Sequence, residues 1–305
     1  MPWYEELDRK IAEYLPDLRY QKDEPMSSHC SFRVGGPARR MAFPERGEQL
    51  VILLQLAEDC AARPLILGKG SNVLPPDGGL ERLVIETGGL AVLSAGEDGT
   101  ITAEAGVPLA RLAEFAAQRG LAGLEFAHGI PGTVGGALCM NAGAYGGEMK
   151  DVVEEVTLLL PEEGVRRFSG AEMAFGYRHS FLSDHPEAVA LRATFRLTPG
   201  DGSAIRERMR ELMGKRRASQ PLEYPSAGST FKRPEGYFAG TLIDQCGLKG
   251  LTVGGAQVSE KHAGFVINRG GATAADVLVL IREVQRRVLE EKGVALQMEV
   301  KLLEP

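Results

Sequence analysis

The chain has 305 residues, of which 44% are hydrophobic and 25% charged, with a mean hydropathy of −0.11. This composition is typical of a soluble globular protein of about two domains, stable without disulfides or metal, and it excludes disorder, collagen and coiled coil. The 35 basic and 41 acidic residues give a net charge of −6, which argues against a nucleic-acid ligand.

Hydrophobic spacing and glycine and proline punctuation predict the regular elements. In chain order we expect a helix at 3–15, a helix at 47–62, strands at 64–67, 82–86, 91–94 and 100–105, a helix at 107–119 that Gly120 ends, and strands at 152–160 and 188–197. Because Asp98-Gly99 is a hairpin signal, the sheet in this region is predicted to be mixed or antiparallel.

Turn-forming residues gather at 198–203 and mark the predicted domain boundary, so we expect domains at 1–199 and 200–305. A basic helix is predicted at 204–217. Thr273 to Asp276 has the form of a capping box, which predicts a helix that Gly293 terminates. Alternating apolar residues over 294–300 predict a half-buried strand with a polar face.

The sequence carries no pattern for secretion, membrane insertion or metal binding. It has no run of 18 apolar residues, and its first ten residues lack an apolar signal region, so we expect a cytoplasmic protein. The four cysteines form no Cys-x-x-Cys pair and the five histidines no His-x-x-x-His pair. We therefore expect reduced, structural thiols and no metal site.

Two glycine-rich loops are candidates for binding a ligand. The first, at 67–74, follows an apolar strand, and its backbone could form an anion nest for a pyrophosphate or simply a turn. It is not a Gly-x-Gly-x-x-Gly fingerprint, because Val73 stands where the third glycine would be. The second, at 128–147, has ten small residues in twenty, which indicates that its backbone approaches a ligand closely.

Four further segments hold candidate chemical groups, each with a structural alternative. The donor fork of Arg178 suits a carboxylate or an oxyanion, although a surface ion pair is the simpler explanation. The serines in 225–234 either donate to a ligand or satisfy the turn. Glu299 is by position a solvated side chain. The cations at 215–217 end a helix, where the dipole favours them with or without a phosphate.

Taken in order, eight segments resemble the UDP-N-acetylenolpyruvoylglucosamine reductase family, flavoproteins that make UDP-N-acetylmuramate for the bacterial cell wall. The resemblance covers nearly the whole chain, from about residue 26 to 303. It rests on residues 31–38, 67–74, 128–147, 177–180, 227–231, 242–250, 258–265 and Glu299.

The resemblance implies an α+β fold, in which an FAD-binding domain of the vanillyl-alcohol oxidase type is followed by a smaller α/β substrate-binding domain. FAD is expected to bind without a covalent bond, and NADPH to act as co-substrate. The implied cofactor contacts are Gly68, Lys69, Gly70, Ser71, Asn72 and Val73 in the first loop and Gly129, Ile130, Pro131, Gly132, Thr133, Gly135, Gly136, Asn141, Ala142 and Gly143 in the second.

The same resemblance assigns the catalytic roles to Arg178, Ser229 and Glu299. Arg178 and Glu299 are expected to stabilise an enolate-type intermediate, formed when hydride from the flavin reaches the enolpyruvyl double bond, and Ser229 to protonate it. A bare carboxylate would repel that intermediate, so Glu299 is expected to be protonated or to act through a hydrogen bond. A serine hydroxyl is a weak acid, so Lys232 is suspected of assisting it.

The remaining implied substrate contacts are Tyr177, Arg217 and Lys261, the last two on charge grounds as partners of the diphosphate. The sequence shows no second dinucleotide fingerprint. NADPH and the sugar nucleotide are therefore expected to use one site in turn, with ping-pong kinetics. We expect a monomer that binds neither nucleic acid nor membrane.

The chain departs from the family pattern at three places. Lys69 stands where a small residue is frequent, and Pro75-Pro76 follows the first loop. Arg233 stands where some members have asparagine. The segment after Arg178 is short, as in the form of the family without a tyrosine-bearing lid.

Two rival functions are compatible with these motifs. A flavin oxidase of the same fold would act on another substrate and could hold FAD covalently through His128 or Cys139. A sugar-nucleotide sensor without catalysis would keep the fold but would not need an acid. The intact set of Arg178, Ser229 and Glu299 argues against the sensor.

Overall fold

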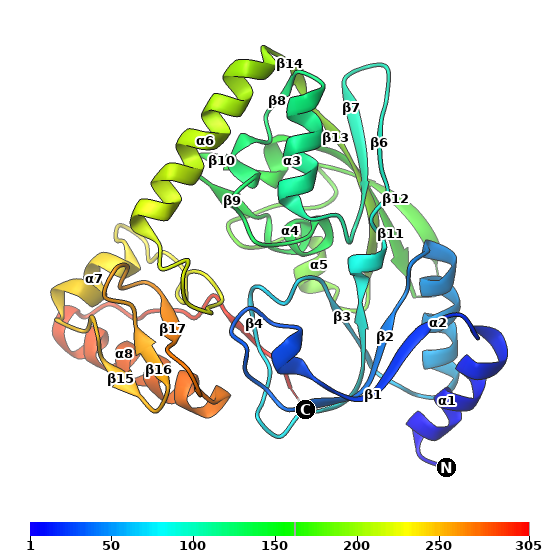
Figure 1. Ribbon diagram of the computed structural model, residues 1–305, viewed down its shortest axis with the longest axis horizontal. Helices are drawn as coiled ribbons and strands as arrows, with labels where there is room; N and C mark the ends of the chain where they lie inside the picture. The colour runs from blue at the N-terminus through cyan, green and yellow to red at the C-terminus, as the bar shows by residue number, and fades with distance from the viewer. Residues whose placement is uncertain (162, 305) are drawn as a thin grey trace. The chain divides into compact units, whose positions relative to one another are not determined.

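The computed structural model describes residues 1–161 and 163–304, and it has the α+β character expected from the sequence (Figure 1). The chain divides into two compact units. Unit 1 comprises Met1–Gln21, Met41–Lys69 and Leu83–Lys215, and unit 2 comprises Lys22–Arg40, Gly70–Arg82 and Arg216–Pro305. Before residue 199 the chain therefore passes twice from unit 1 to unit 2 and back. A single boundary near residue 200 does not describe this path. The division into domains at 199/200 stays a prediction.

Two helices and a four-stranded sheet begin the chain. The helices are α1 (Trp3–Tyr14) and α2 (Gly47–Asp59). The strands, in sheet order, are β1 (Arg19–Pro25), β2 (Pro37–Phe43), β5 (Leu80–Glu86) and β3 (Pro64–Leu67). β3 runs parallel to β5. Leu7 and Ile11, one turn apart on α1, are buried in one cluster with Leu50 and Leu53 of α2, so the two helices lie side by side.

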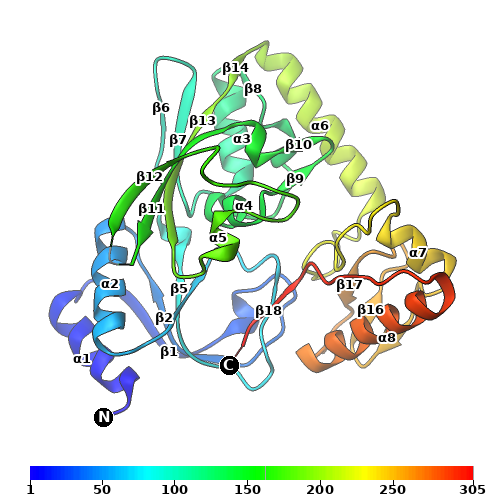
Figure 2. The same cartoon turned by 180° about the vertical axis from the view of Figure 1, so that it is seen from behind.

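A five-stranded antiparallel sheet forms the rest of the core of unit 1. Its strands, in order, are β12 (Gly164–Ser169), β11 (Val153–Leu160), β13 (Val189–Arg196), β7 (Thr100–Glu104) and β6 (Leu93–Ala95). The helices α3 (Leu109–Gln118) and α4 (Val134–Met140) lie on one face, as both views show (Figure 2). Leu112 and Val134 are buried in one hydrophobic cluster with Val156 and Phe195 of the sheet. Two further helices are the short α5 (Phe181–Asp184) and the long α6 (Gly202–Ser219). Two strand pairs are also present: β8 (Leu121–Ala122) with β14 (Thr198–Pro199), and β9 (Gly143–Ala144) with β10 (Gly147–Glu148).

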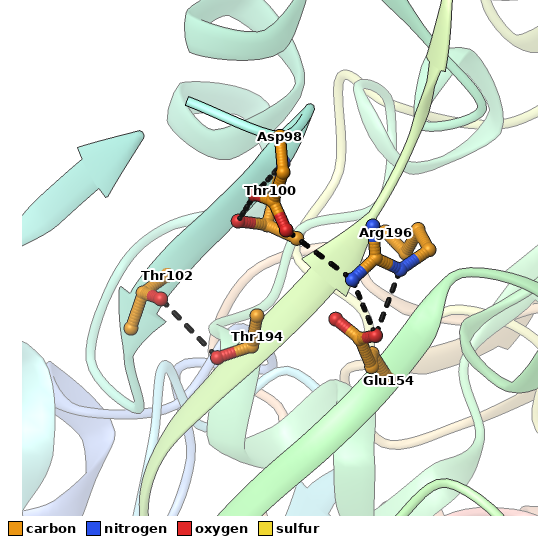
Figure 3. A network of polar contacts seen from close by, with 6 residues as sticks. All are labelled: Asp98, Thr100, Thr102, Glu154, Thr194 and Arg196. Atoms are coloured by element: carbon orange, nitrogen blue, oxygen red, sulfur yellow. Dashed lines mark hydrogen bonds and ion pairs between the residues drawn. The ribbon is translucent and has the colours of Figure 1, made fainter. Parts of the chain in front are cut away.

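Polar side chains cross the sheet near the β6–β7 hairpin (Figure 3). Arg196 donates to Glu154 at 2.7 Å and lies 3.4 Å from Asp98. Thr102 and Thr194 share a hydrogen bond of 3.2 Å between β7 and β13. These side chains are partly exposed, so the charged pairs fix cross-strand register more than they add stability.

Unit 2 is built around one helix and a three-stranded sheet. The strands are β15 (Thr252–Val253), β16 (Ala256–Val258) and β17 (Val266–Asn268), and α8 (Ala274–Lys292) covers one face of them, with α7 (Ala239–Gln245) beside it. The predicted capping box of α8 is present: the Thr273 hydroxyl accepts from the Asp276 amide at 3.0 Å, and the Asp276 carboxylate accepts from the Thr273 amide at 3.0 Å. Gly293 ends α8 in the left-handed region.

The prediction of a strand over 294–300 is wrong, because this segment does not form regular β-structure. Leu296 and Val300 are buried and Gln297 is exposed, so the alternation is real. The segment, however, faces the irregular stretch 230–232 and makes a single bridge, from Met298 to Phe231. A strand, β18, forms only at Lys301–Leu302, parallel to β4 (Val73–Leu74). The alternation of apolar residues shows which side chains are buried. A ladder of backbone hydrogen bonds also needs a partner segment of regular structure.

None of the helices in residues 1–161 and 163–304 is long and apolar enough to cross a membrane. None of the four cysteines forms a disulfide in residues 1–161 and 163–304. Burial raises the pKa of the Cys30 thiol and that of the Cys60 thiol, which keeps both protonated and unreactive.

Candidate functional site

The two glycine loops meet in unit 1 at Gly68 and Thr133. A Cβ built on Gly68 would lie 2.5 Å from the Thr133 hydroxyl oxygen, so only glycine allows the end of β3 to come so close to the second loop. The amides of Lys69, Gly70 and Ser71 donate no hydrogen bond within the described residues. Consecutive unused amides of this kind form an anion-binding nest.

The start of α4, which lies within the second loop, packs against the protein. Thr133 caps α4, and the amides of the next two residues donate to Val107 and Ala105 carbonyls at 2.9 and 2.8 Å. Gly135 packs on Ala105 so closely that an added Cβ would lie 3.1 Å from the alanine methyl. The first amides of α4 are therefore already satisfied and do not form an anion-binding nest.

His128 stands at the start of the second loop with a buried polar atom. Its Nδ1 has no hydrogen-bond partner in the described part of the chain, although His128 and the two following residues are only half-buried. An unsatisfied buried nitrogen is costly unless a ligand completes it. Between them the two loops have the features of a dinucleotide site: they approach each other closely, the first has unused amides, and the second has a buried polar atom without a partner among the described residues.

The far end of the second loop is fixed by Asn141, the residue that caps the C-terminus of α4. Asn141 has a φ of 39° and is 1% exposed. Its Nδ2 donates to the Glu148 carboxylate at 2.6 Å and to the Gly176 carbonyl at 2.9 Å, and its Oδ1 accepts from the Lys150 amide at 3.0 Å. Both N–H groups are used inside the protein, so the Asn141 side chain has no donor left for a cofactor.

The other predicted cofactor contacts on this segment are parts of tight backbone pairings. Gly132 accepts from the Leu109 amide at 3.0 Å, and Ala142 accepts from the Met149 amide at 3.0 Å. Gly143 pairs with Glu148 in the two-stranded β9–β10. Ile130 and Pro131 form the turn that follows the buried 3-10 helix at Glu125–Ala127.

Arg178 occupies a tight turn of unit 1. The Gly176 amide donates to the His179 carbonyl at 3.0 Å, and the His179 amide donates back at 3.3 Å. Arg178 has a φ of 55°, in the region that favours glycine. Its guanidinium carbon lies 5.2 Å from the centre of the Tyr177 ring, and that tyrosine is 54% exposed. Arg178 is one of seven described non-glycine residues with a positive φ, and such a backbone persists only where its surroundings hold it.

Ser229 and Glu299 come together in unit 2 through backbone pairing. The Glu299 amide donates to the Thr230 carbonyl at 2.8 Å, and the Lys232 amide donates to the Gln297 carbonyl at 2.8 Å. Ser229, which precedes Thr230, is exposed, and Glu299 is half-buried. The predicted acid and the predicted carboxylate therefore stand on neighbouring segments.

The first glycine loop also contacts this pair. The Asn72 Nδ2 donates to the Glu299 carbonyl at 3.1 Å, and the Asn72 carbonyl accepts from the Lys301 amide at 3.0 Å. Val73 continues this contact as part of β4. Both backbone polar atoms of Glu299 are thus held, one by Thr230 and one by Asn72.

The predicted diphosphate contacts lie together on unit 2. The Lys261 ammonium donates to the Arg217 carbonyl at 2.7 Å and lies 4.0 Å from the Glu223 carboxylate. Lys232 lines a cavity of about 400 Å³ together with Arg233, Glu235, Tyr237 and Gln297. The Arg233 guanidinium lies 4.4 Å from the centre of the exposed Phe238 ring.

Two buried residues that support the site are not predicted by the sequence. Thr230 is fully buried, and its hydroxyl accepts from the Val266 amide at 2.9 Å. Ser180, also fully buried, donates to the Cys139 carbonyl at 3.0 Å. Each adjoins a predicted catalytic position by one or two residues, but a buried hydroxyl leaves no periodic signal.

Comparison with known proteins connects these segments. The family model described as UDP-N-acetylenolpyruvoylglucosamine reductase, C-terminal domain, matches residues 220–303, and the model described as FAD binding domain matches residues 38–169. The first range holds Ser229 and Glu299, and the second holds both glycine loops.

Whole-length relatives carry the same name. The UDP-N-acetylenolpyruvoylglucosamine reductase of Agathobacter rectalis is 49% identical over 97% of both chains, and that of Levilactobacillus brevis is 47% identical over 96% of both. The crystal structure of UDP-N-acetylenolpyruvylglucosamine reductase from Thermus caldophilus superimposes with a TM-score of 0.79 at 36% identity, covering 94% of this chain and 99% of that one.

Proposed function

The chain belongs to the UDP-N-acetylenolpyruvoylglucosamine reductase family, and from this premise we propose that Arg178, Ser229 and Glu299 are its catalytic residues. The protein is an FAD-dependent oxidoreductase of peptidoglycan precursor synthesis. It uses NADPH to reduce UDP-N-acetylglucosamine enolpyruvate to UDP-N-acetylmuramate. The observation that supports the proposed assignment is the backbone hydrogen bond from Glu299 to Thr230, which pairs the segment of the exposed Ser229 with that of the half-buried Glu299.

FAD, when bound, supplies the hydride relay between NADPH and the enolpyruvyl group. The residues that would hold it are those of the two glycine loops, and they fit a dinucleotide: the amides of 69–71 are unused, Gly68 permits close approach, and the His128 Nδ1 lacks a partner in the described residues. FAD is bound without a covalent link in this proposal.

Arg178 holds the carboxylate of the substrate and stabilises the charge that develops there. A guanidinium cannot lose its proton in a protein, so the charge that it offers is fixed throughout the reaction. Glu299 stabilises the same charge only in its protonated form or through a hydrogen bond, because an ionised carboxylate would repel it. Its backbone is held by Thr230 and Asn72, which limits the movement of its side chain.

Ser229 delivers the proton to the carbon next to the carboxylate. The hydroxyl is a weak acid, so a neighbour must assist it. Lys232 is three residues away on the same segment, and its ammonium group is the assistant that we propose. Tyr177, Arg217, Lys232 and Lys261 are the proposed substrate contacts beside the three catalytic residues.

The two halves of the chain have different roles in the reaction. We propose that residues 1–199 serve FAD and 200–305 serve the sugar nucleotide, and that the enzyme works as a cytoplasmic monomer. NADPH and the sugar nucleotide enter one site in turn, since the sequence has no second dinucleotide fingerprint.

One anaerobic titration tests the proposed function. The flavin absorption of the purified holoenzyme should bleach with NADPH and return on addition of UDP-N-acetylglucosamine enolpyruvate without oxygen. Parallel lines in two-substrate kinetics should accompany this result. Bands that return only with air would indicate an oxidase of another substrate, and intersecting lines would contradict the shared site.

A further inference from the structure

We propose that Asn141 is a positioning residue for Arg178, clamping from α4 the turn that carries the arginine. This inference rests on the proposed role of Arg178. It concerns only unit 1, in which both residues lie. Three observations support it: the turn is strained, it is tied at both ends to the same helix, and asparagine is the residue type that this tie requires.

The backbone conformation of the turn at Arg178 is unfavourable for the residue that adopts it. Arg178 has a φ of 55°, which glycine adopts readily and arginine does not. The two backbone hydrogen bonds between Gly176 and His179 close the turn but do not remove this strain. Such a conformation persists only where the surroundings enforce it, so the contacts that flank the turn decide where the guanidinium is placed.

Both flanks of the turn are tied to the last residues of α4. At the start, the Gly176 carbonyl accepts from the Asn141 Nδ2 at 2.9 Å. At the end, the Ser180 hydroxyl donates to the Cys139 carbonyl at 3.0 Å. Ser180 and Asn141 are 0% and 1% exposed, so water does not compete for these bonds.

Asparagine suits this position for two separate reasons. It tolerates the left-handed conformation that ends α4, with a φ of 39°. Its amide is also oriented unambiguously: the Glu148 carboxylate requires a donor at 2.6 Å and the Lys150 amide requires an acceptor at 3.0 Å. With one N–H fixed on Glu148, the other is directed at the Gly176 carbonyl.

α4 thereby links two parts of the site. Its first residue follows Thr133, which contacts Gly68 of the first glycine loop, and its last residue precedes Asn141. Seven helical residues span about 10 Å. A shift of the turn relative to the cofactor loop would misplace the arginine, and misplacement by about 1 Å can cost about 100-fold in rate.

The test separates the two half-reactions in the holoenzyme by anaerobic stopped flow. Asn141→Gly keeps the left-handed backbone but removes the clamp. We expect reoxidation of the reduced flavin by UDP-N-acetylglucosamine enolpyruvate to slow by about 10- to 100-fold, with flavin reduction by NADPH and FAD affinity within about twofold of wild type. The Ser183 hydroxyl donates to the same Cys139 carbonyl at 2.9 Å, so the other flank is released by the double substitution Ser180→Ala/Ser183→Ala, which should show the same pattern.

Glu148→Gln is the matched control, because glutamine keeps an acceptor oxygen for Asn141, and both half-reactions should stay within about twofold of wild type. Arg178→Lys provides the background for a double-mutant cycle. If Asn141 acts through Arg178, Asn141→Gly should slow the Arg178→Lys protein by no more than about twofold.

Each remaining outcome has a defined meaning. Normal reoxidation in Arg178→Lys would refute the proposed function of Arg178 itself. Slow reoxidation in Arg178→Lys with normal rates in Asn141→Gly and in Ser180→Ala/Ser183→Ala would refute only the positioning role. Loss of FAD, or equal slowing of both half-reactions in these variants, would also overturn it, because the substituted side chains would then support the fold of the cofactor loop as a whole.

Discussion

The arginine turn of unit 1 and the Ser229–Glu299 pair of unit 2 are held in different ways. Arg178 lies in a strained turn whose flanks are tied by the side chains of Asn141 and Ser180. Ser229 and Glu299 lie on extended segments that pair through their backbones, at Thr230 and at Lys232. The position of Arg178 therefore depends mainly on side-chain hydrogen bonds, whereas Ser229 and Glu299 depend mainly on main-chain hydrogen bonds, to which the Asn72 side chain adds one.

The difference has a consequence for substitutions. A change at Asn141 should move the guanidinium, because the two backbone hydrogen bonds within the turn do not tie it to α4. A change beside the pair should lower the stability of unit 2 before it moves the proposed catalytic groups, because the main-chain hydrogen bonds at Thr230 and Lys232 persist until the unit opens. Kinetic effects and stability effects should thus separate between the two regions.

The largest effect is expected from Ser229→Ala. The backbone pairing at Thr230 does not involve the Ser229 side chain, so the substitution should remove the acid without disturbing the pair. Reoxidation of the reduced flavin by the enolpyruvyl substrate should slow by about 10²- to 10⁴-fold, with the free energy of unfolding unchanged. The measurement is anaerobic stopped flow in H₂O and D₂O, combined with denaturant unfolding. Unchanged rate and unchanged stereochemistry of solvent deuterium in the product would remove Ser229 from this role.

A smaller effect, confined to cofactor binding, is expected from Gly68→Ala. The new methyl group collides with the Thr133 hydroxyl, and relieving such a collision costs about 1–3 kcal/mol. If the two loops must stay in contact to bind FAD, the dissociation constant for FAD should rise by about 10- to 100-fold. Fluorescence titration of the apoprotein with FAD measures it. Gly78→Ala is the control, because a Cβ at Gly78 meets nothing within 4 Å; equal affinities of the two variants would show that the contact is irrelevant to FAD.

Thr230→Val tests the claim that the pair in unit 2 is held by its backbone. The substitution leaves the Val266 amide without its buried acceptor, which should lower the free energy of unfolding by about 1–3 kcal/mol. The rate constants of both half-reactions should stay near wild type, because the Glu299 amide still donates to the carbonyl of residue 230. Thr230→Ser keeps the hydroxyl and should be nearly as stable as wild type. A large loss of rate in Thr230→Val at full FAD occupancy would show that side chains hold this region too.

The sequence predicts the elements with strong periodicity well. The buried face of α8, from Val277 to Val288, its capping box at Thr273 and its end at Gly293 are all confirmed. The strand at Pro64–Leu67 and the helix at 47–59 are also present within the predicted ranges. In these elements, local spacing and burial agree, so no distant partner is needed to decide the structure.

Other features could not be predicted, because they depend on residues far away in the chain. The extended segment 294–300 has a strand's alternation, but its partner at 230–232 is irregular. The bond from Asn141 to the Gly176 carbonyl spans 35 residues. The motif comparison named Asn141 as a cofactor contact, while its amide is directed at the turn of Arg178. The resemblance proposes which residues form the site, and the structure shows which contacts hold these residues.

The smallest effect concerns pH and is confined to unit 2. Burial lowers the pKa of His262 below its ordinary value of 6.5, and Lys249 adds to this. The neutral ring has a structural role, because its Nδ1 accepts from the Gly264 amide at 3.1 Å, and the Gly264 carbonyl accepts from the Thr230 amide at 2.8 Å. Below pH 6.5 the unfolded chain binds a proton that the folded chain resists, so the free energy of unfolding should fall as the pH drops from about 7 towards 5.

His262→Gln offers the matched comparison, because glutamine can supply an acceptor for the Gly264 amide but does not titrate. Denaturant unfolding of the holoenzyme at pH 7, 6 and 5 should give a shallower decline for this variant than for wild type. Protonation of His262 acts on the backbone pairing next to Ser229, so the decline should appear as earlier opening of unit 2, with the rate constants at pH 7 unchanged. Parallel pH profiles of the two proteins would mean that the pKa of His262 is the same in the folded and unfolded chains. The stability of the backbone hydrogen bonds around Thr230 would then not depend on the neutral form of His262.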